Sequence, residues 1–174
     1  PYGSSSGTKK EQVTSMFNKI ASNYDFLNRF LSLGIDVYWR KKAIALLKPL
    51  KPQKILDVAT GTADVAIEMS KSLKPERIIG LDISKQMLEV GQKKVTKANL
   101  NKIISLQVGD SEHLPFPDNQ FDAITVAFGV RNFENLEKGI QEMYRTLDKK
   151  GHLLVLEFSK PTLFPLKQIF NFYF

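Results

Sequence analysis

The chain has 174 residues, a formal net charge of +7 and no cysteine. A chain of this length is most simply one domain, and the lack of cysteine excludes disulfides, thiolate chemistry and cysteine-bound zinc. Its two histidines are isolated, so we expect no metal site. We find neither an apolar run long enough to cross a bilayer nor a signal-peptide pattern, which predicts a soluble, cytoplasmic protein.

Two groups of basic residues contribute much of the positive charge. Neither group alternates with aromatic residues as a single-strand nucleic-acid groove does, so we expect no nucleic-acid partner. A solvated helix face and peripheral contact with the anionic inner face of a membrane both stay open. The groups are Arg40, Lys41, Lys42, Lys48, Lys51 and Lys54, and Lys93, Lys94, Lys97 and Lys102.

The N-terminal part predicts helices. Residues 1–9 are rich in turn formers, and we expect them to be flexible. An apolar stripe at helical spacing starts after Lys9, is interrupted near Tyr24–Asp25 and Asn28, and continues to Gly34; a further helix is predicted at 37–47. The density of Phe and Leu in residues 10–48 is consistent with ordinary packing or with a lid over an apolar substrate.

From residue 54 the pattern alternates between strands and helices. This alternation predicts an α/β fold, with a doubly wound, mainly parallel Rossmann-like sheet and right-handed crossovers, over a core at 54–159. Ser84 is expected to cap the second core helix. Strands are predicted at 54–58, 77–82, 103–107, 121–127 and 152–158, and helices at 63–73, 84–98 and 135–148.

The run KILDVATGTAD, residues 54–64, combines a buried strand pattern, a small-residue turn and the start of a helix. Such a turn presents backbone N–H groups to a nucleotide, but this one lacks the G-x-G-x-x-G pattern of dinucleotide sites. Asp82, at the end of the next strand, is placed where a carboxylate can accept the hydroxyls of a ribose. This is either an ordinary turn with an ordinary acid, or a site for a nucleoside without pyrophosphate, which indicates S-adenosyl-L-methionine.

Ligands of open α/β sheets bind outside the carboxyl ends of the strands. The predicted ends of the first three strands bring Asp57, Gly61–Thr62, Asp82 and Gly109–Ser111 to that edge, where a side chain of the last run can meet an adenine amino group. The fourth and fifth strands end in residues 127–132 and 157–159.

Three runs are shared with a known family. They are YDFLNRFLSLGIDVYWR (24–40), DSEHLPFPDNQFD followed by AFGVRNF (110–122 and 127–133), and YRTLDKKGHLLVLEFSKP (144–161). Together they resemble the menaquinone/ubiquinone biosynthesis C-methyltransferases, which are class I S-adenosyl-L-methionine-dependent enzymes. The resemblance covers about residues 10 to 165. Its PFPDNxFD piece is widespread among small-molecule methyltransferases, whereas FGVRN with LEFSKP is much narrower.

The resemblance implies S-adenosyl-L-methionine as cofactor and carbon methylation of a polyprenylated quinol, first of all demethylmenaquinol to menaquinol. Alternatives are a benzoquinol of the ubiquinone pathway, another small apolar acceptor, or a non-catalytic module that binds the cofactor or nucleic acid. A homo-oligomer stays open. Family members continue with the last strands of a seven-stranded sheet, so we expect 160–174 to begin a truncated C-terminal segment. The family's cofactor positions match Thr62, Asp82, Asp110, Ser111 and Ala127, to which the strand ends add Asp57 and Gly61.

Methylation of a quinol carbon requires control of a hydroxyl proton whose pKa is about 10. Arg131 is our candidate for stabilising a developing phenolate, and Asn132 for orienting the same oxygen. Asp25 and Asp36 are candidate bases, ahead of His113.

These catalytic assignments have structural alternatives. Arg131 can pair with Glu157 or Asp110, Asp25 and Asp36 can cap helices, and His113 and His152 can be plain surface residues. The chain also departs from the family pattern, which commonly has His at the position of Asp36. Ala63 stands at a usual glycine, so its backbone must keep a negative φ or accept strain.

Overall fold

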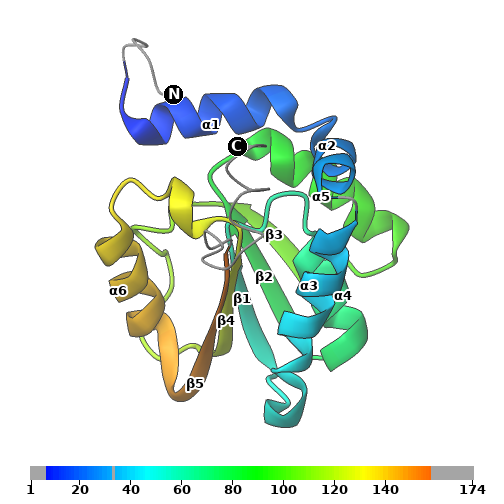
Figure 1. The fold of residues 1–174 in the computed structure, drawn as a ribbon. Helices are drawn as coiled ribbons and strands as arrows, with labels where there is room; N and C mark the ends of the chain where they lie inside the picture. The colour runs from blue at the N-terminus through cyan, green and yellow to red at the C-terminus, as the bar shows by residue number, and fades with distance from the viewer. Residues whose placement is uncertain (1–6, 33, 158–174) are drawn as a thin grey trace, which may run out of the picture.

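The computed structural model describes residues 7–32 and 34–157 and has a parallel sheet at its centre (Figure 1). The strand order is β3-β2-β1-β4-β5, and each neighbouring pair is parallel. This arrangement confirms the predicted α/β class. The strands are β1 (Lys54–Val58), β2 (Arg77–Asp82), β3 (Ile104–Val108), β4 (Phe121–Ala127) and β5 (Leu147–Leu156).

Helices α4 (Asp64–Leu73), α5 (Lys85–Lys97) and α6 (Leu136–Thr146) follow β1, β2 and β4, with the short 3-10 helices η1 (Lys48–Leu50) and η2 (Val130–Asn132). Ser84 caps α5 as predicted, because its hydroxyl accepts the N–H of Met87. The prediction for the last helix and strand was wrong at their junction. Leu147 is extended and pairs with Phe121, so β5 begins where the helical pattern was expected to continue. Residues 158 and 159 of the predicted core lie outside the described residues.

Three helices precede the sheet: α1 (Lys9–Ile20), α2 (Tyr24–Leu31) and α3 (Ile35–Ala45). The break was predicted at Tyr24–Asp25 and Asn28, but all three residues belong to α2, and the chain turns at residues 21–23 instead. Figure 1 shows α1 lying across one end of the sheet, while α3 runs beside α4. Of these helices, α1 therefore covers the edge at which the strands end, whereas α3 packs on a face of the sheet.

The sheet is apolar on both faces. Consecutive residues of a strand point to opposite faces, so Ile55 belongs to one core cluster and Leu56 to the other. The first cluster packs beneath α3, α4 and α5, and the second includes Met143 of α6. Burial of both faces is typical of a parallel sheet with helices on each side.

The turn between β1 and α4 is fixed by a buried carboxylate. Asp57 accepts hydrogen bonds from the hydroxyls of Thr60, at 2.6 Å, and Thr125, at 2.5 Å. The N–H of Thr60 in turn donates to the carbonyl of Leu81, at 3.0 Å. One carboxylate and one backbone bond thus connect the turn to both neighbouring strands, β4 and β2.

The turn has an unusual backbone. Ala59, Gly61 and Ala63 have φ values of 54°, 57° and 64°, in the left-handed region. Of the two outcomes expected for Ala63, the structure has the strained one, which costs roughly 1–2 kcal/mol in a non-glycine residue. Because the side chain of Ala63 is fully buried and close to Gly91, tertiary packing holds this conformation.

Burial raises the pKa of Asp57 to about 6, although the hydroxyls of Thr125 and Thr60 lower it. An unfolded aspartate titrates near pH 4, so between about pH 4 and 6 the folded protein holds a proton that the unfolded chain has lost. The stability that this group contributes is therefore present at low pH and is lost as the pH rises through that window.

We predict that Asp57→Asn removes this pH dependence. The amide keeps the size of the carboxylate and can bond to both hydroxyls, but it does not titrate. Urea unfolding should show that the variant gains about 2–3 kcal/mol relative to the wild type between pH 4 and pH 7. Parallel pH profiles for the two proteins would contradict the assignment.

Candidate functional site

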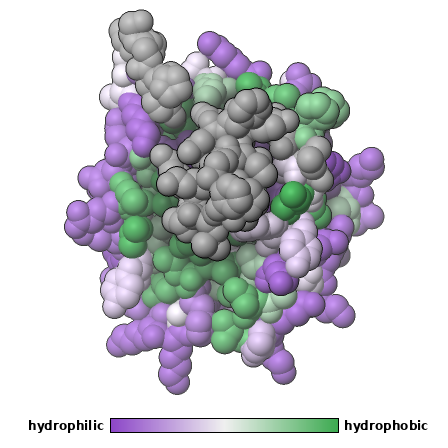
Figure 2. All heavy atoms as spheres, in the orientation of Figure 1, coloured by the Kyte–Doolittle hydropathy of each residue, from purple (hydrophilic) through white to green (hydrophobic). Residues whose placement is uncertain are grey.

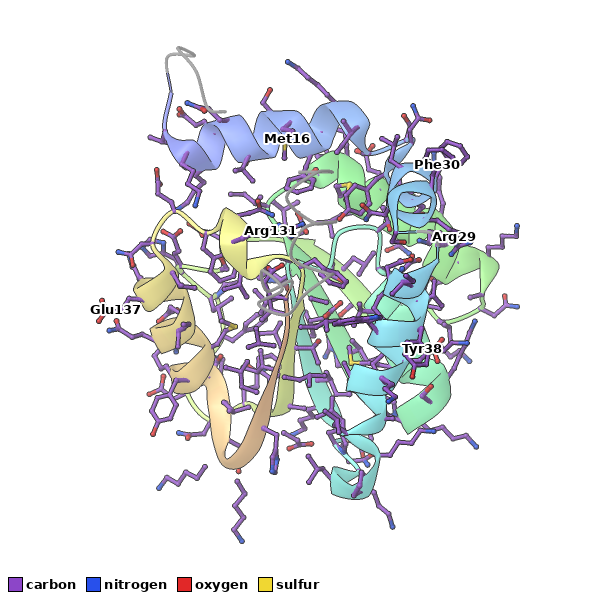
Figure 3. All side chains as sticks on the ribbon, viewed as in Figure 1. Met16, Arg29, Phe30, Tyr38, Arg131 and Glu137 are labelled. Atoms are coloured by element: carbon purple, nitrogen blue, oxygen red, sulfur yellow. The ribbon has the colours of Figure 1, made fainter. Side chains whose placement is uncertain are left out.

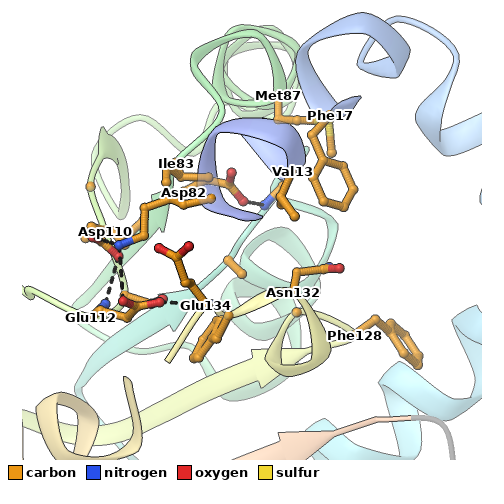
Figure 4. A pocket seen from close by; sticks show the side chains of 18 of the residues that line it. Val13, Phe17, Asp82, Ile83, Met87, Asp110, Glu112, Phe128, Asn132 and Glu134 are labelled. Atoms are coloured by element: carbon orange, nitrogen blue, oxygen red, sulfur yellow. Dashed lines mark hydrogen bonds and ion pairs between the residues drawn. The ribbon is translucent and has the colours of Figure 1, made fainter. Parts of the chain in front are cut away.

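A cavity lies at the carboxyl ends of the strands, beneath α1 (Figure 4). It leaves about 80 Å³ of space for water-sized molecules and is partly open to solvent. Its walls come from the β1–α4 turn, the ends of β2, β3 and β4, and α1. Predicted site residues in these walls are Gly61, Asp82, Asp110, Ser111, Ala127 and Asn132.

Asp82 is buried at the end of β2. Its two oxygens accept the N–H groups of Gly61 and Ser84, each at 2.8 Å, which fixes the carboxylate against the turn. Burial raises its pKa, while these backbone donors act in the opposite direction. Each oxygen retains a lone pair, so the carboxylate can still accept a ligand hydroxyl.

Glycine shapes two walls of the cavity. A Cβ on Gly109 would lie 2.5 Å from a methyl of Leu81, and one on Gly129 would lie 2.6 Å from the Cβ of Ala59. Side chains at these positions would displace the cavity walls. A fixed carboxylate beside close backbone fits a nucleoside, as the predicted cofactor S-adenosyl-L-methionine requires.

Asp110 and Glu112 are joined by a lysine of α1. The Nζ of Lys10 lies 2.7 Å from Asp110 and 3.1 Å from Glu112 (Figure 4). Desolvation opposes ionisation of Asp110, but hydrogen bonds from Lys10 and the Glu112 N–H hold its pKa below the ordinary value. Lys9 donates to the carbonyls of Arg131 and Phe133, so the first turn of α1 is attached on both sides of the cavity.

Two predicted cofactor residues, Asp57 and Thr62, do not line the cavity. Asp57 bonds to Thr60 and Thr125, and the hydroxyl of Thr62 donates to Asp25 at 2.6 Å. Both side chains are already engaged in holding the turn. The structure therefore favours a positioning role for them over direct contact with a ligand.

The Arg131–Asn132 pair is divided by the structure. Asn132 lines the cavity, whereas Arg131 is not among the lining residues, and its side chain is 54% exposed. The guanidinium of Arg131 lies 3.1 Å from Glu157, which is the ion pair that the sequence left open. Arg131 is nevertheless close enough for its charge to lower the pKa of Tyr24, a cavity residue.

Asp25 and Asp36 lie in a charged network outside the cavity wall. Lys94 contacts Asp25 at 2.8 Å and also pairs with Asp64, and Arg40 joins Asp64 to Asp36. Neither aspartate caps a helix, because the cap positions are Asn23 and Gly34.

Ion pairing makes Asp36 a poor base. Desolvation raises the pKa of Asp36. The hydrogen bond from Ser32 and the charge of Arg40 lower it by a larger amount, so the pKa of Asp36 lies below its ordinary value. His113 is exposed and contacts Asp110 and Lys138, and His152 lies exposed on β5.

Several cavity residues were not predicted. Tyr24 and Phe128 occur in the runs that resemble the family, and Phe17 belongs to the apolar stripe of α1, so a signal existed for these three. No sequence pattern pointed to Lys10, because its contacts with Asp110 and Glu112 depend on where α1 crosses the sheet. Burial raises the pKa of Tyr24, against a hydrogen bond with Asn28 and the charge of Arg131.

Within residues 7–32 and 34–157 no cluster of three or more acidic or histidine side chains could hold a metal ion. In the same part of the chain no helix is sufficiently long and apolar to span a membrane.

Comparison with known proteins agrees with this geometry. Residues 5–174 match the model of the ubiE/COQ5 methyltransferase family. The chain is 56% identical over 173 residues to a demethylmenaquinone methyltransferase of Bacteroides fragilis, covering 99% of the chain and 70% of that protein. A ubiquinone/menaquinone biosynthesis C-methyltransferase, UbiE, of Geotalea uraniireducens is 44% identical, covering 95% of the chain and 71% of that protein.

Among solved structures, a Methanococcus maripaludis protein described as an S-adenosyl-L-methionine-dependent methyltransferase superposes with a TM-score of 0.70 at 26% identity. The match covers 98% of this chain and 74% of that one. With the cavity, the buried Asp82 and the family match together, the chain belongs to the ubiE/COQ5 methyltransferase family.

Proposed function

We propose that the protein transfers the methyl group of S-adenosyl-L-methionine to a ring carbon of a polyprenylated quinol, converting demethylmenaquinol to menaquinol. The main structural support is the buried Asp82, held by Gly61 at the edge of a cavity with aromatic walls. The relative at 56% identity is named for demethylmenaquinone alone, which favours the naphthoquinol over a benzoquinol.

The cavity residues suggest how the cofactor is held. Asp82 would accept the ribose hydroxyls, and Asp110 with Ser111 would meet the adenine, since they follow β3. Ala127 would line the cofactor after β4. Because Asp110 already pairs with Lys10, an adenine amino group would share this carboxylate with α1.

The bound cofactor supplies an electrophilic methyl group on a sulfonium. The chain's own task is to position the quinol and to favour its ionised form. Arg131 would stabilise the phenolate oxygen and Asn132, from the cavity wall, would orient it. Phe17 and Phe128 would exclude water and pack against the ring.

The structure also bears on the choice of base. Because Asp25 and Asp36 are ion-paired, they are weaker candidates than the sequence suggested. We propose that lowering the quinol pKa through Arg131 contributes more than proton removal by either aspartate. The positively charged guanidinium stabilises the anion without accepting a proton.

The prenyl tail of the proposed acceptor also indicates where the protein would act. A tail of this kind partitions into lipid, so the protein would act at a membrane surface through peripheral contact and without spanning it. Assembly into a homo-oligomer is compatible with this arrangement.

We predict that Asp82→Asn weakens the binding of S-adenosyl-L-methionine about tenfold to a hundredfold, because charge-assisted hydrogen bonds contribute roughly 1.5–3 kcal/mol. Isothermal titration calorimetry measures the effect directly. Asp118→Asn is the matched control, since Asp118 is exposed and its carboxylate pairs with Arg145, away from the cavity. Equal affinities for Asp82→Asn and wild type would exclude the assigned role.

We predict that Arg131→Ala lowers kcat by about 10²–10³ while the affinity for cofactor stays unchanged, as expected for a group that stabilises charge in the transition state. Glu157→Gln removes the negative partner of Arg131 and tests whether the pair is purely structural. If Glu157→Gln loses as much activity as Arg131→Ala, the catalytic role is wrong. The control is Arg77→Ala, because Arg77 lies at the start of β2, at the end of that strand away from Asp82 and the cavity.

We predict that kcat/KM is at least about tenfold higher for demethylmenaquinol than for a benzoquinol with the same tail. The second ring of the naphthoquinol buries additional apolar surface against the cavity walls, and tenfold corresponds to about 1.4 kcal/mol. Methyl transfer from labelled cofactor to each quinol measures the ratio. A preference for the benzoquinol would replace the proposed substrate but keep the reaction class.

A further inference from the structure

Large apolar side chains are exposed along α2 and α3. Phe26 and Phe30 of α2 are 70% and 66% exposed, and Ile35, Tyr38 and Trp39 of α3 are between 46% and 59% exposed. Single exposed apolar residues are normal on soluble proteins, but a contiguous group indicates an interaction surface. Figure 2 shows hydrophobic side chains at the end of the molecule where α2 lies.

Helical spacing aligns these residues within each of the two helices. Phe26 and Phe30 are four positions apart, and their rings stack with centroids 6.0 Å apart. On α3, Ile35, Tyr38 and Lys42 follow at helical intervals, and the ammonium of Lys42 lies 5.6 Å from the centre of the Tyr38 ring. Phe30, Arg29 and Tyr38 lie on the same flank in Figure 3, with Glu137 of α6 on the opposite flank. We call the exposed residues Phe26, Phe30, Ile35, Tyr38 and Trp39 the α2–α3 face.

The charge around this face is positive. Residues 22–51 contain six basic and two acidic residues. The two acids, Asp25 and Asp36, are paired with Lys94 and Arg40. The exposed charges on α2 and α3 are therefore cations: Arg29, Lys41 and Lys42.

We propose that the α2–α3 face docks on an anionic lipid bilayer. This inference deepens the proposed function, because it rests on an acceptor whose tail resides in the membrane. Phe26, Phe30 and Trp39 would insert at the level of the headgroups, where aromatic side chains are favoured. The neighbouring lysines and Arg29 would bind anionic headgroups, which attract each near-surface cation.

The observations favour lipid over other occupants. An apolar group surrounded by cations, with its acids already paired, is complementary to a surface that combines hydrocarbon with negative charge. A second copy of the chain would bring the same cations face to face across a two-fold axis and would be opposed by their repulsion. One of its two helices, α2, begins with Tyr24 in the cavity wall, so docking would place that side of the cavity near the lipid.

The test is cosedimentation of the purified protein with vesicles of phosphatidylcholine, with and without phosphatidylglycerol. We expect binding to the vesicles that contain phosphatidylglycerol, and a loss of at least about tenfold in partition coefficient for Phe26→Ser/Phe30→Ser. Arg29→Gln/Lys41→Gln/Lys42→Gln should remove the preference for anionic vesicles and make the residual binding insensitive to salt.

The controls lie on the other side of the molecule. Tyr144→Ser removes an aromatic side chain that is 79% exposed on α6, and Lys149→Gln/Lys150→Gln removes two exposed cations of β5. Both should bind vesicles as the wild type does. All variants should retain the wild-type rate with a water-soluble quinol that lacks the tail, which separates docking from catalysis.

Three outcomes would overturn the proposal. The first is wild-type protein that stays in the supernatant with both kinds of vesicle. The second is a loss of binding in Tyr144→Ser as large as in the Phe26/Phe30 variant. The third is an oligomer that Phe26→Ser/Phe30→Ser converts to monomer without any change in vesicle binding, which would assign the face to a second copy. If tail-free quinol is not methylated by the wild type, the proposed function fails while the vesicle result stands.

Discussion

The buried carboxylate of Asp57 is the constraint on which the cofactor side of the molecule depends. It accepts two hydroxyls, one from the turn that follows β1 and one from β4, in an environment that raises its pKa. A buried carboxylate without such donors would be strongly destabilising, so Thr60 and Thr125 are tied to it. The turn is thereby held in a left-handed path that directs the Gly61 N–H to Asp82. A residue outside the cavity thus fixes two residues within it.

A second constraint acts on the helices before the sheet. Lys94, Asp64 and Arg40 connect α2 and α3 to α4 and α5 through alternating charges. These pairs are partly buried, where the loss of one partner would leave a charge uncompensated. Lys9 and Lys10 attach α1 to the loops after β4 and β3. Part of the positive charge is therefore structural, which the sequence did not distinguish from charge available to a partner.

The proposed functional residues also fall into two groups, one that lines the cavity and one that forms structural ion pairs. Asn132 and the proposed cofactor residues Asp82, Asp110 and Ser111 line one cavity, while Asp25 and Asp36 belong to the charged network. The ion pairs of Asp25 and Asp36 hold α2 and α3 against the neighbouring helices. This separation is the reason for our proposal that an ionised quinol is stabilised rather than deprotonated by either aspartate. Aromatic side chains of α2 and α3 are exposed, and α2 also contributes Tyr24 to the cavity wall.

The sequence by itself determined the sheet class, the bounds of β1, β2 and β4, and the convergence of Asp82, Asp110 and Asn132 at one edge. These features follow from local periodicity and from the rule that parallel strands end together. Only the tertiary structure decided that Leu147 continues into β5, that Ala63 is left-handed and that Asp25 pairs with Lys94. The reason is physical: each depends on a partner far away in sequence, such as Phe121 across the sheet or Lys94 on another helix. Periodicity records which face of an element is buried, but not which side chain it meets there.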